Sequence, residues 1–347
     1  MPNEILTRAI DAVASGEHLT ADHAEAVLDE IMGGRAGEVQ AGAFLIALRT
    51  KGETVPELIG LARAMRSLAA PVTTSREDLV DTCGTGGGPS TFNVSTAAGL
   101  VAAAAGCAVA KHGNRSNTSK CGSADLLEAL GVKIELTPEQ VGECLDQLGF
   151  GFMFAPRHHA AMANVAGVRR ELGVRTVFNF LGPLTNPAGA RRQLLGIADR
   201  HFQETVAEAL AGLGSERALV VSAADGLDEL SITVPTRVIE VEGGRTREWF
   251  LEPAEFGLGP DGPGRIAADT AAEIAGGTPA ENAAAVHSVL AGEPGPRRDL
   301  VLLNAGAAIY VAGAADGIVA GIARAGEAID SGAASTLVER LVELTNR

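Results

Sequence analysis

A glycine-rich stretch, DTCGTGGGPSTFNVST at residues 81–96, contains the first residue types whose spacing could bind a ligand. Four of the five residues from Gly84 to Gly88 are glycine, hydroxyl side chains follow them, and a helix is expected to begin near Ser95. A glycine-rich turn at a helix N-terminus exposes backbone N–H groups, and the helix dipole favours negative charge there. The stretch therefore predicts a loop that binds phosphate.

Two well-known phosphate motifs do not match this loop. A P-loop requires a lysine before Ser or Thr, and no lysine follows the glycines here. The dinucleotide fingerprint G-x-G-x-x-G does not match either, because Pro89 stands where its last glycine is required. From this stretch alone, the alternative to an anion site is a flexible turn that ends in an ordinary Ser/Thr helix cap.

A second donor-rich segment, AKHGNRSNTSKCGSADLLEALG, covers residues 110–131. Its cations are Lys111, His112, Arg115 and Lys120, and Ser, Asn and Thr side chains stand between them. Both segments follow consecutive predicted strands, so in a parallel sheet they should meet at the carboxyl edge, where α/β folds bind ligands. A solvated basic loop is the alternative for this segment alone. Together the two segments suit a substrate with more than one phosphate.

An acidic pair follows a later predicted strand, in SAADGLDELSI at residues 222–232. Asp228 and Glu229 are adjacent there. Neighbouring carboxylates suit Mg²⁺, whose remaining positions are filled by phosphate oxygens and water. A solvated acidic pair is the alternative, so the significance of this pair depends on the two phosphate loops.

The segment RHHAAMANVAGVRRELGVRTVFNFLGPLTNPAGA, residues 157–190, predicts a helix followed by a loop. Apolar residues at helical spacing give one buried face, which places His159, Arg169 and Arg170 on other faces. An arginine here could bind a carboxylate in bidentate fashion, and a surface salt bridge is the alternative for either one. The two prolines near the end predict a shaped loop or hinge.

The elements that must position these residues change along the chain. Residues 1–70 show the apolar spacing of helices only. From about residue 78, short apolar runs alternate with helical stretches, which is the pattern of βαβ units and a mainly parallel sheet. Residues 232–255 predict an antiparallel hairpin through Gly243–Gly244, and Ala-rich helices follow it.

Composition excludes several classes of function. The 347 residues contain 28 Lys and Arg against 43 Asp and Glu, and the net charge of −15 argues against a binder of nucleic acid or anionic membranes. No window approaches the roughly 18 to 20 apolar residues of a membrane span, and the first residues show no signal peptide. The 4 dispersed cysteines form no CxxC, which indicates neither a zinc site nor a disulfide framework. We expect a soluble cytoplasmic protein.

Several long motifs together carry a resemblance to a known family. They are GTGG…TFNVST, KHGNRS…SKCGSADLLEALG, HHAAMANVAGVRRELGVRTVFNFLGPLTNPA and DGLDEL, and the likeness extends over nearly the whole chain. In these motifs the sequence resembles the anthranilate phosphoribosyltransferases of tryptophan biosynthesis. The resemblance implies that anthranilate and phosphoribosyl pyrophosphate (PRPP) are joined with Mg²⁺, giving N-(5-phosphoribosyl)anthranilate and pyrophosphate.

The resemblance also implies an α/β fold of the nucleoside phosphorylase class III type. Residues 1–72 and about 165–190 would form a small all-helical domain. That domain would be hinged to a large α/β domain, residues about 75–164 and 191–347, in which helices surround a mainly parallel sheet. The large domain would bind PRPP and metal, and the molecule would be a homodimer with no nucleic-acid or membrane partner.

Site residues follow from the resemblance position by position. PRPP would be bound by Gly84, Gly87, Gly88, Thr91, Asn93, Val94, Ser95, Thr96, Lys111, His112, Gly113, Asn114, Arg115, Ser116, Asn117, Thr118, Ser119 and Ser123. Anthranilate would be bound by Gly84, His112, Asn114, His159, Arg169 and Pro183. A pair of Mg²⁺ ions would be held by Ser95, Asp228 and Glu229. No covalent nucleophile is implied, and no residue is assigned as proton acceptor.

The sequence departs from the family pattern at two places. The family usually reads GTGGD, whereas Gly88 stands at the position of that acid, and the loop up to Thr91 is one residue shorter than in many relatives. The hydroxyl-rich RSVSSKSGS of the family reads RSNTSKCGS here, with Asn117, Thr118 and Cys121. Because Asn117 and Thr118 keep polar donors, we expect phosphate binding to survive. The change at Gly88 leads us to expect ordinary chemistry with an altered affinity for PRPP.

Three other functions can be weighed against this resemblance. A pyrimidine-nucleoside phosphorylase would share the fold, but the Arg-Gly-Leu…Thr-Gly-Gly-Thr type of stretch expected of it is absent. A nucleic-acid-binding relative should be basic and lack GPLTNPA, whereas this chain is acidic and contains it. An enzyme of the same fold that uses another aromatic amine stays open.

Overall fold

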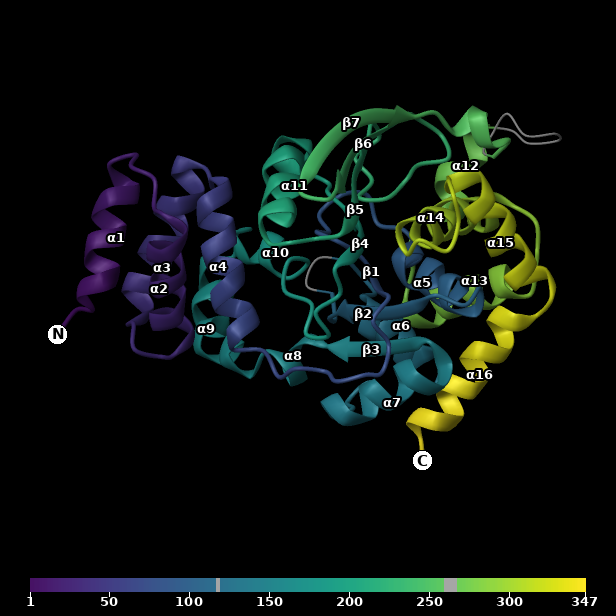
Figure 1. Cartoon of the computed structure of the whole chain (residues 1–347), viewed down its shortest axis with the longest axis horizontal. Coiled ribbons are helices and arrows are strands. Elements are labelled where there is room, and N and C mark those ends of the chain that lie inside the picture. The colour runs from purple at the N-terminus through teal and green to yellow at the C-terminus, as the bar shows by residue number, and fades with distance from the viewer. Residues whose placement is uncertain (117–118, 259–266) are drawn as a thin grey trace.

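The computed structural model describes residues 1–116, 119–258 and 267–347 (Figure 1). Two residues implied in PRPP binding, Asn117 and Thr118, lie outside the described residues. An N-terminal group of helices lies to one side of a central sheet, and the C-terminal helices lie on the other side (Figure 1). No helix in the described part of the chain is long and apolar enough to cross a membrane.

The N-terminal region is helical, as its apolar spacing predicts. Its elements are α1 (Glu4–Ala14), α2 (Ala21–Met32), α3 (Glu38–Lys51) and α4 (Val55–Ser67). Side chains cap their first turns: the Thr20 hydroxyl accepts a hydrogen bond from the His23 N–H, and Glu57 accepts one from the Thr54 N–H at 2.8 Å. Such caps satisfy the backbone N–H groups that the first turn of a helix leaves without partners. Residues next to each helix start therefore determine where the helix begins.

The described residues contain a 7-stranded sheet in the order β3-β2-β1-β4-β5-β6-β7. Its strands are β1 (Leu79–Gly84), β2 (Ala108–Gly113), β3 (Phe150–Phe154), β4 (Arg192–Gly196), β5 (Arg217–Ala223), β6 (Thr236–Glu242) and β7 (Arg245–Leu251). Pairing is parallel from β3 to β5 and antiparallel from β5 to β7. The mainly parallel sheet and the hairpin through Gly243–Gly244 are thus confirmed, whereas β4 was not among the predicted strands because it follows the proline-containing segment directly.

The two faces of the sheet pack into different hydrophobic cores. Leu194 and Leu195 are neighbours on β4, yet each belongs to a different core, because successive side chains of a strand point to opposite faces. One core contains α5 (Val94–Ala104) and α14 (Pro296–Val311). The other contains α11 (Gln203–Gly212) and residues of all the N-terminal helices.

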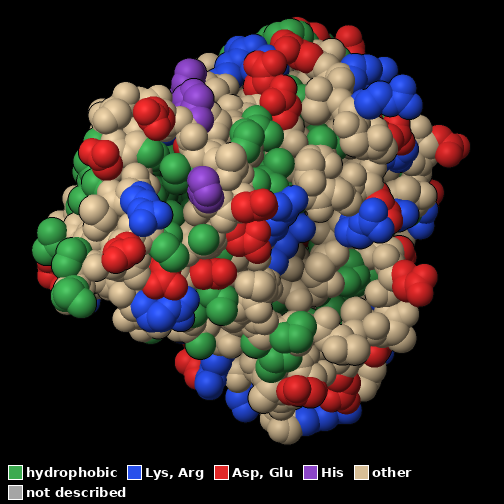
Figure 2. All heavy atoms as spheres, turned by 60° about the vertical axis from the view of Figure 1, so that its left-hand side comes forward, with side chains coloured by type: hydrophobic (Ala, Val, Ile, Leu, Met, Phe, Trp, Pro, Cys, Tyr) green, Lys and Arg blue, Asp and Glu red, His purple; other side chains and the backbone are tan. Residues whose placement is uncertain are grey.

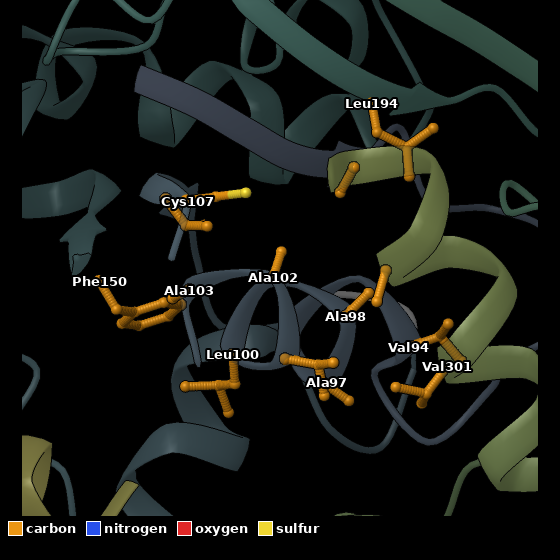
Figure 3. Packing of buried hydrophobic residues seen from close by; sticks show 14 of the residues in the cluster. Val94, Ala97, Ala98, Leu100, Ala102, Ala103, Cys107, Phe150, Leu194 and Val301 are labelled. Atoms are coloured by element: carbon orange, nitrogen blue, oxygen red, sulfur yellow. The ribbon is translucent and has the colours of Figure 1, made fainter. Parts of the chain in front are cut away.

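Helix α5 packs closely on the sheet because its side chains are small (Figure 3). A Cβ at Gly99 would lie 2.9 Å from the Thr82 hydroxyl oxygen and 3.3 Å from Val109, so only glycine permits this approach. The close contact fixes the N-terminus of α5, and with it Asn93 and Ser95, beside the ends of β1 and β2. The glycine-rich loop is therefore held between a strand end and a rigid helix.

The remaining helices complete the structure. They are α6 (Ser123–Ala129), α7 (Pro138–Leu148), α8 (Ala155–His158), α9 (Ala163–Leu172), α10 (Phe178–Leu181), α12 (Ala267–Ile274), α13 (Pro279–Leu290), α15 (Ile318–Asp330) and α16 (Ala333–Thr345). Helices α9 and α10 pack against the N-terminal helices, with α9 on α2 and α3 and α10 on α4. Buried residues of α9, α10, α11 and the N-terminal helices form one hydrophobic core. The chain thus has a small N-terminal helical domain and a large α/β domain, whereas the bounds given for the two domains and the hinge between them stay predictions.

Candidate active site

Three of the predicted ligand-binding segments lie at the same edge of the sheet. Strands β1, β2, β4 and β5 are parallel, so the loops that follow β1, β2 and β5 leave the sheet on the same side. This is the carboxyl edge, where the strand ends of α/β folds leave room for ligands. The prediction that the glycine-rich loop and the basic segment open side by side is confirmed by the direct pairing of β1 with β2.

The acidic pair contacts the glycine-rich loop directly. The Gly86 N–H donates to Asp228 Oδ2 at 2.7 Å, and the Thr91 hydroxyl donates to Glu229 Oε1 at 2.9 Å. A Cβ at Gly84 would lie 2.3 Å from Asp228 Oδ2, so a side chain at that position would displace the carboxylate. The glycines therefore let a carboxylate approach the loop closely and accept a backbone hydrogen bond from it.

The environment of the acidic pair suits a cation. Burial raises the pKa of Glu229 to about 8, and repulsion from Asp228 adds to that rise. Burial also raises the pKa of Asp228. Glu229 Oε2 is buried and accepts no hydrogen bond from any described residue. A bound Mg²⁺ would satisfy that oxygen and remove the repulsion, and the hard carboxylate donors match its preference.

The third residue implied in metal binding, Ser95, lies beside a buried lysine. The Lys111 ammonium donates to Ser95 Oγ at 3.3 Å and to the Thr82 carbonyl oxygen. Burial lowers the pKa of Lys111, while attraction from Asp81 and Glu229 opposes that change. Lys111 therefore holds its ammonium at the start of α5, as a fixed cation between the sheet and the acidic pair.

A buried polar network behind the site was not found from the sequence. Asp81 lies within β1, where its Oδ1 accepts a hydrogen bond from the His112 N–H at 3.3 Å. Its Oδ2 accepts one from Asn186 Nδ2 at 2.8 Å, and the same amide donates to the Ala110 carbonyl oxygen at 2.8 Å. An acid inside the apolar run DLVDTC was the available signal. The network ties the proline-containing segment to the two strands that carry the site.

Asn93 holds the start of α5 in position. Its backbone is left-handed, with φ of 68°, a conformation that asparagine adopts more readily than most residues. Its amide donates to the Cys121 carbonyl oxygen at 3.0 Å, and its Oδ1 accepts from Asn282 Nδ2 at 2.7 Å. Asn282, on α13, had no signal in the sequence. These contacts connect the glycine-rich loop to the basic segment.

The basic segment places its donors unequally. Arg115 is exposed and forms ion pairs with Asp125, at 2.8 Å, and with Glu128. Ser116 and Ser119 are joined through their hydroxyls at 2.6 Å, beside the N-terminus of α6. The Arg115 charge is therefore partly neutralised within the protein, whereas the small hydroxyls form a compact cluster.

Further residues implied in PRPP binding lie close to these two loops. A Cβ at Gly113 would lie 2.2 Å from the Ser123 hydroxyl oxygen, which itself donates to the Asn114 carbonyl oxygen at 3.3 Å. Val94 and Thr96 are buried in the first turn of α5. The roles of all these residues toward PRPP stay predictions.

Two histidines implied on the anthranilate side lie together. The His112 and His159 rings are 5.0 Å apart, and the Nε2 atom of each is buried without a partner among the described residues. His112 Nδ1 lies 3.2 Å from the Gly182 carbonyl oxygen, and the neighbouring Pro183 carbonyl accepts a hydrogen bond from Gln193 at 2.8 Å. The structure therefore brings His112, His159 and the segment at Pro183 together.

Arg169 differs from the exposed, ion-paired Arg115. It is half-buried in the last turn of α9, where its guanidinium lies 5.1 Å from the centre of the Phe178 ring. It forms no ion pair with any carboxylate in the described residues, and burial lowers its pKa. Arg170, by contrast, is exposed. A half-buried guanidinium without a carboxylate partner is suited to an anionic ligand.

The buried histidines make stability depend on pH. Burial lowers the pKa of His159 from 6.5 to about 4, so protonation below pH 6.5 favours the unfolded chain. We expect the wild type to lose about 2 kcal/mol more unfolding free energy than His159→Asn when the pH falls from about 7 to about 5. Urea titrations at both pH values measure this difference. His287→Asn, at an exposed position, is the control, and parallel losses in wild type and His159→Asn would contradict the prediction.

Gly88 is packed too closely for a side chain. A Cβ there would lie 2.2 Å from the Gly226 carbonyl oxygen, so Gly88→Ala must push the glycine-rich loop away from the loop of Asp228. We expect the KM for PRPP to rise about tenfold, in line with the usual cost of overpacking. Gly88→Asp, which restores the acid of the family, should show the same rise. Gly317→Ala is the control because open space surrounds that glycine, and an unchanged KM would show that position 88 does not matter.

Charges of both signs are mixed on one face of the molecule (Figure 2). On the face shown in Figure 2, Lys and Arg side chains are interspersed with Asp and Glu. The net charge of the chain is −15. Phosphate backbones require clustered cations, which this face does not present.

Comparison with known proteins identifies the family of this chain. Residues 7–69 match the model of the glycosyl transferase family, helical bundle domain, and residues 76–335 match that of the glycosyl transferase family, a/b domain. The chain is 51% identical to the anthranilate phosphoribosyltransferase of Moorella thermoacetica, over 97% of this chain and 98% of that protein.

Solved structures give the same result. The anthranilate phosphoribosyltransferase of Thermus thermophilus has a TM-score of 0.90 and 46% identity, covering 98% of this chain and 99% of that one. The Saccharomyces cerevisiae enzyme in complex with PRPP and Mg has a TM-score of 0.87 and 28% identity, covering 98% of each chain. The yeast enzyme is also known in complex with 4-fluoroanthranilate. The chain therefore belongs to the anthranilate phosphoribosyltransferase family.

Proposed function

We propose that the carboxyl edge of the sheet is where this protein transfers the phosphoribosyl group of PRPP to the amine of anthranilate. Membership of the family makes the chain a pentosyltransferase of tryptophan biosynthesis. One observation carries the location of the site: Asp228 and Glu229 contact the glycine-rich loop, and Glu229 keeps a buried oxygen without a partner among the described residues. That arrangement supports a site for a metal and a pyrophosphate side by side.

Magnesium fits the residues of this edge. The yeast relative was solved with PRPP and Mg, and here Asp228, Glu229 and the Ser95 hydroxyl supply oxygen donors of the required kind. No cluster of three or more His, Cys, Asp and Glu that could hold a metal occurs among the described residues, so phosphate oxygens and water would complete the coordination. When bound, Mg²⁺ would stabilise the negative charge of the pyrophosphate leaving group. We propose a pair of ions per subunit.

The residues of the chain have separable tasks in the reaction. Breaking the bond between C1 of the ribose and pyrophosphate leaves positive character on the sugar and negative charge on the leaving group. Lys111, which donates to Ser95 at the start of α5, and backbone N–H groups of the glycine-rich loop would stabilise that leaving charge. Because the aniline nitrogen of anthranilate is a weak nucleophile, holding it close to C1 provides much of the rate increase.

Anthranilate would bind to the arginine and histidine side chains described above and to the residues beside them. Arg169 would bind the carboxylate, and Asn114, His112, His159 and Pro183 would line the approach. Neutral histidines suit this role, because burial lowers the pKa of His112 to about 3 and leaves the ring uncharged at neutral pH. A proton acceptor for the amine is not assigned.

The molecular organisation completes the proposal. We propose a cytoplasmic homodimer, in which residues 1–72 and about 165–190 move as a helical domain against the α/β domain. The packing of α9 and α10 on the N-terminal helices supports that grouping. Gel filtration with light scattering would test the oligomeric state.

One experiment tests the function directly. Purified protein is mixed with anthranilate, PRPP and Mg²⁺, and anthranilate fluorescence is followed over time, with EDTA in a parallel sample. We expect a loss of fluorescence that EDTA abolishes. Constant fluorescence with intact PRPP binding, measured by calorimetry, would instead indicate another amine as acceptor.

A further inference from the structure

Arg175 lies on the glycine-rich loop, although it comes from the segment between α9 and α10. Its Nη2 donates a hydrogen bond to the Thr85 carbonyl oxygen at 2.9 Å. A Cβ at Gly87 would lie 2.3 Å from Nη1 and 2.9 Å from Cζ, so the guanidinium occupies the space that a side chain would need. Gly87 has φ of 96°, a conformation that favours glycine. Both the backbone and the missing side chain of Gly87 therefore make room for this arginine.

The charge of Arg175 is not neutralised by an ion pair. It is half-buried, and no carboxylate of the described residues lies within salt-bridge distance of it. Arg115, which follows β2, is by contrast paired with Asp125 and Glu128.

The position of Arg175 matches the needs of a pyrophosphate. The glycine-rich loop and the acidic pair would surround the phosphates, and two carboxylates at that place repel an anion. A guanidinium offers five N–H donors in a planar arrangement, and the hydrogen bond to Thr85 uses one of them, which leaves others for phosphate oxygens. Its anchor at Thr85 also fixes the direction in which those donors point.

We propose that Arg175 is a further PRPP-binding residue, which is held by Thr85 and Gly87 and donates to the pyrophosphate group. The inference rests on the proposed function, because it assumes that pyrophosphate lies at this loop. It adds to the site a second cation from residues 157–190, six positions after Arg169.

Calorimetric titration with PRPP and with inorganic pyrophosphate, each with Mg²⁺, tests this role without anthranilate. Arg175→Gln keeps an N–H donor for Thr85 but loses the charge, and we expect binding of both ligands to weaken about tenfold. Arg175→Lys keeps the charge and should weaken binding by only about threefold, since it cannot donate in a fork. Arg170→Gln removes an exposed positive charge from the neighbouring helix and should leave binding unchanged.

The outcomes separate this inference from the proposed function. Wild-type affinity in Arg175→Gln, or equal weakening in the Gln and Lys variants, would overturn the binding role of the charge. If anthranilate is not consumed but Arg175→Gln still weakens binding of PRPP, the inference stands and the acceptor assignment fails. If the wild type binds neither PRPP nor pyrophosphate, both are wrong.

Discussion

Asp228→Asn is expected to lower kcat/KM about a thousandfold. In the wild type the Gly86 N–H donates to the Asp228 carboxylate at 2.7 Å. The amide of the Asn variant keeps an oxygen that can accept this hydrogen bond, so the contact with the loop survives. The substitution removes the negative charge that Mg²⁺ requires, and with it the stabilisation of the leaving pyrophosphate, an effect worth several kcal/mol in metal sites. Initial rates of anthranilate consumption at several Mg²⁺ concentrations measure the loss.

The controls separate charge from folding. Asp316→Asn makes the same chemical change at an exposed position of another loop and should leave the rate unchanged. Because the charged Asp228 is half-buried with a raised pKa, the Asn variant should melt no lower than the wild type without metal. Full activity of Asp228→Asn, with the Mg²⁺ dependence of the wild type, would mean that the metal binds elsewhere.

Arg169→Ala is expected to raise the KM for anthranilate about a hundredfold. The guanidinium packs on Phe178 and forms no ion pair within the described residues, so its charge is available to a carboxylate. Loss of one partner from a half-buried, bidentate charge pair costs roughly 2 to 5 kcal/mol. Steady-state kinetics with anthranilate varied at saturating PRPP give the value, and the KM for PRPP should change little.

Two related variants make the test specific. Arg169→Lys should recover only part of the affinity, because an ammonium cannot donate two parallel hydrogen bonds to a carboxylate. Arg170→Ala removes the adjacent, exposed arginine and should have no effect on either KM. A rise in the KM for anthranilate in Arg170→Ala, with none in Arg169→Ala, would reverse the assignment of the two arginines.

Local patterns along the chain predicted most of the secondary structure. Strands β1, β2, β3 and β5 follow from short apolar runs, and caps such as Thr20 set helix starts through contacts within a single turn. Strand β4 was not predicted because its five residues contain a single short pair of apolar side chains, Leu194 and Leu195, and begin soon after the loop at Pro187. Only the pairing of β4 with β1 and β5 in the folded sheet identifies it as a strand.

The candidate site was predictable only in part. The parallel sheet rule brought the glycine-rich loop and the basic segment to one edge, and the motifs identified the family. No pattern separates Arg115 from Arg175, since both are cations near polar residues. The fold pairs Arg115 with carboxylates of α6 and directs Arg175 to Thr85, 90 residues away along the chain.

The amino-acid pattern was sufficient for most of the elements, for the loop that can receive a phosphate and for the family. Those features depend on residue type and on contacts between near neighbours, which a pattern records. The contacts of the site needed the folded chain: Asp228 accepts from Gly86, 142 residues away, Lys111 reaches Ser95, and Glu229 keeps an oxygen without a partner among the described residues. They depend on how closely loops approach one another, and that distance is set by packing such as that of Gly99 against Thr82.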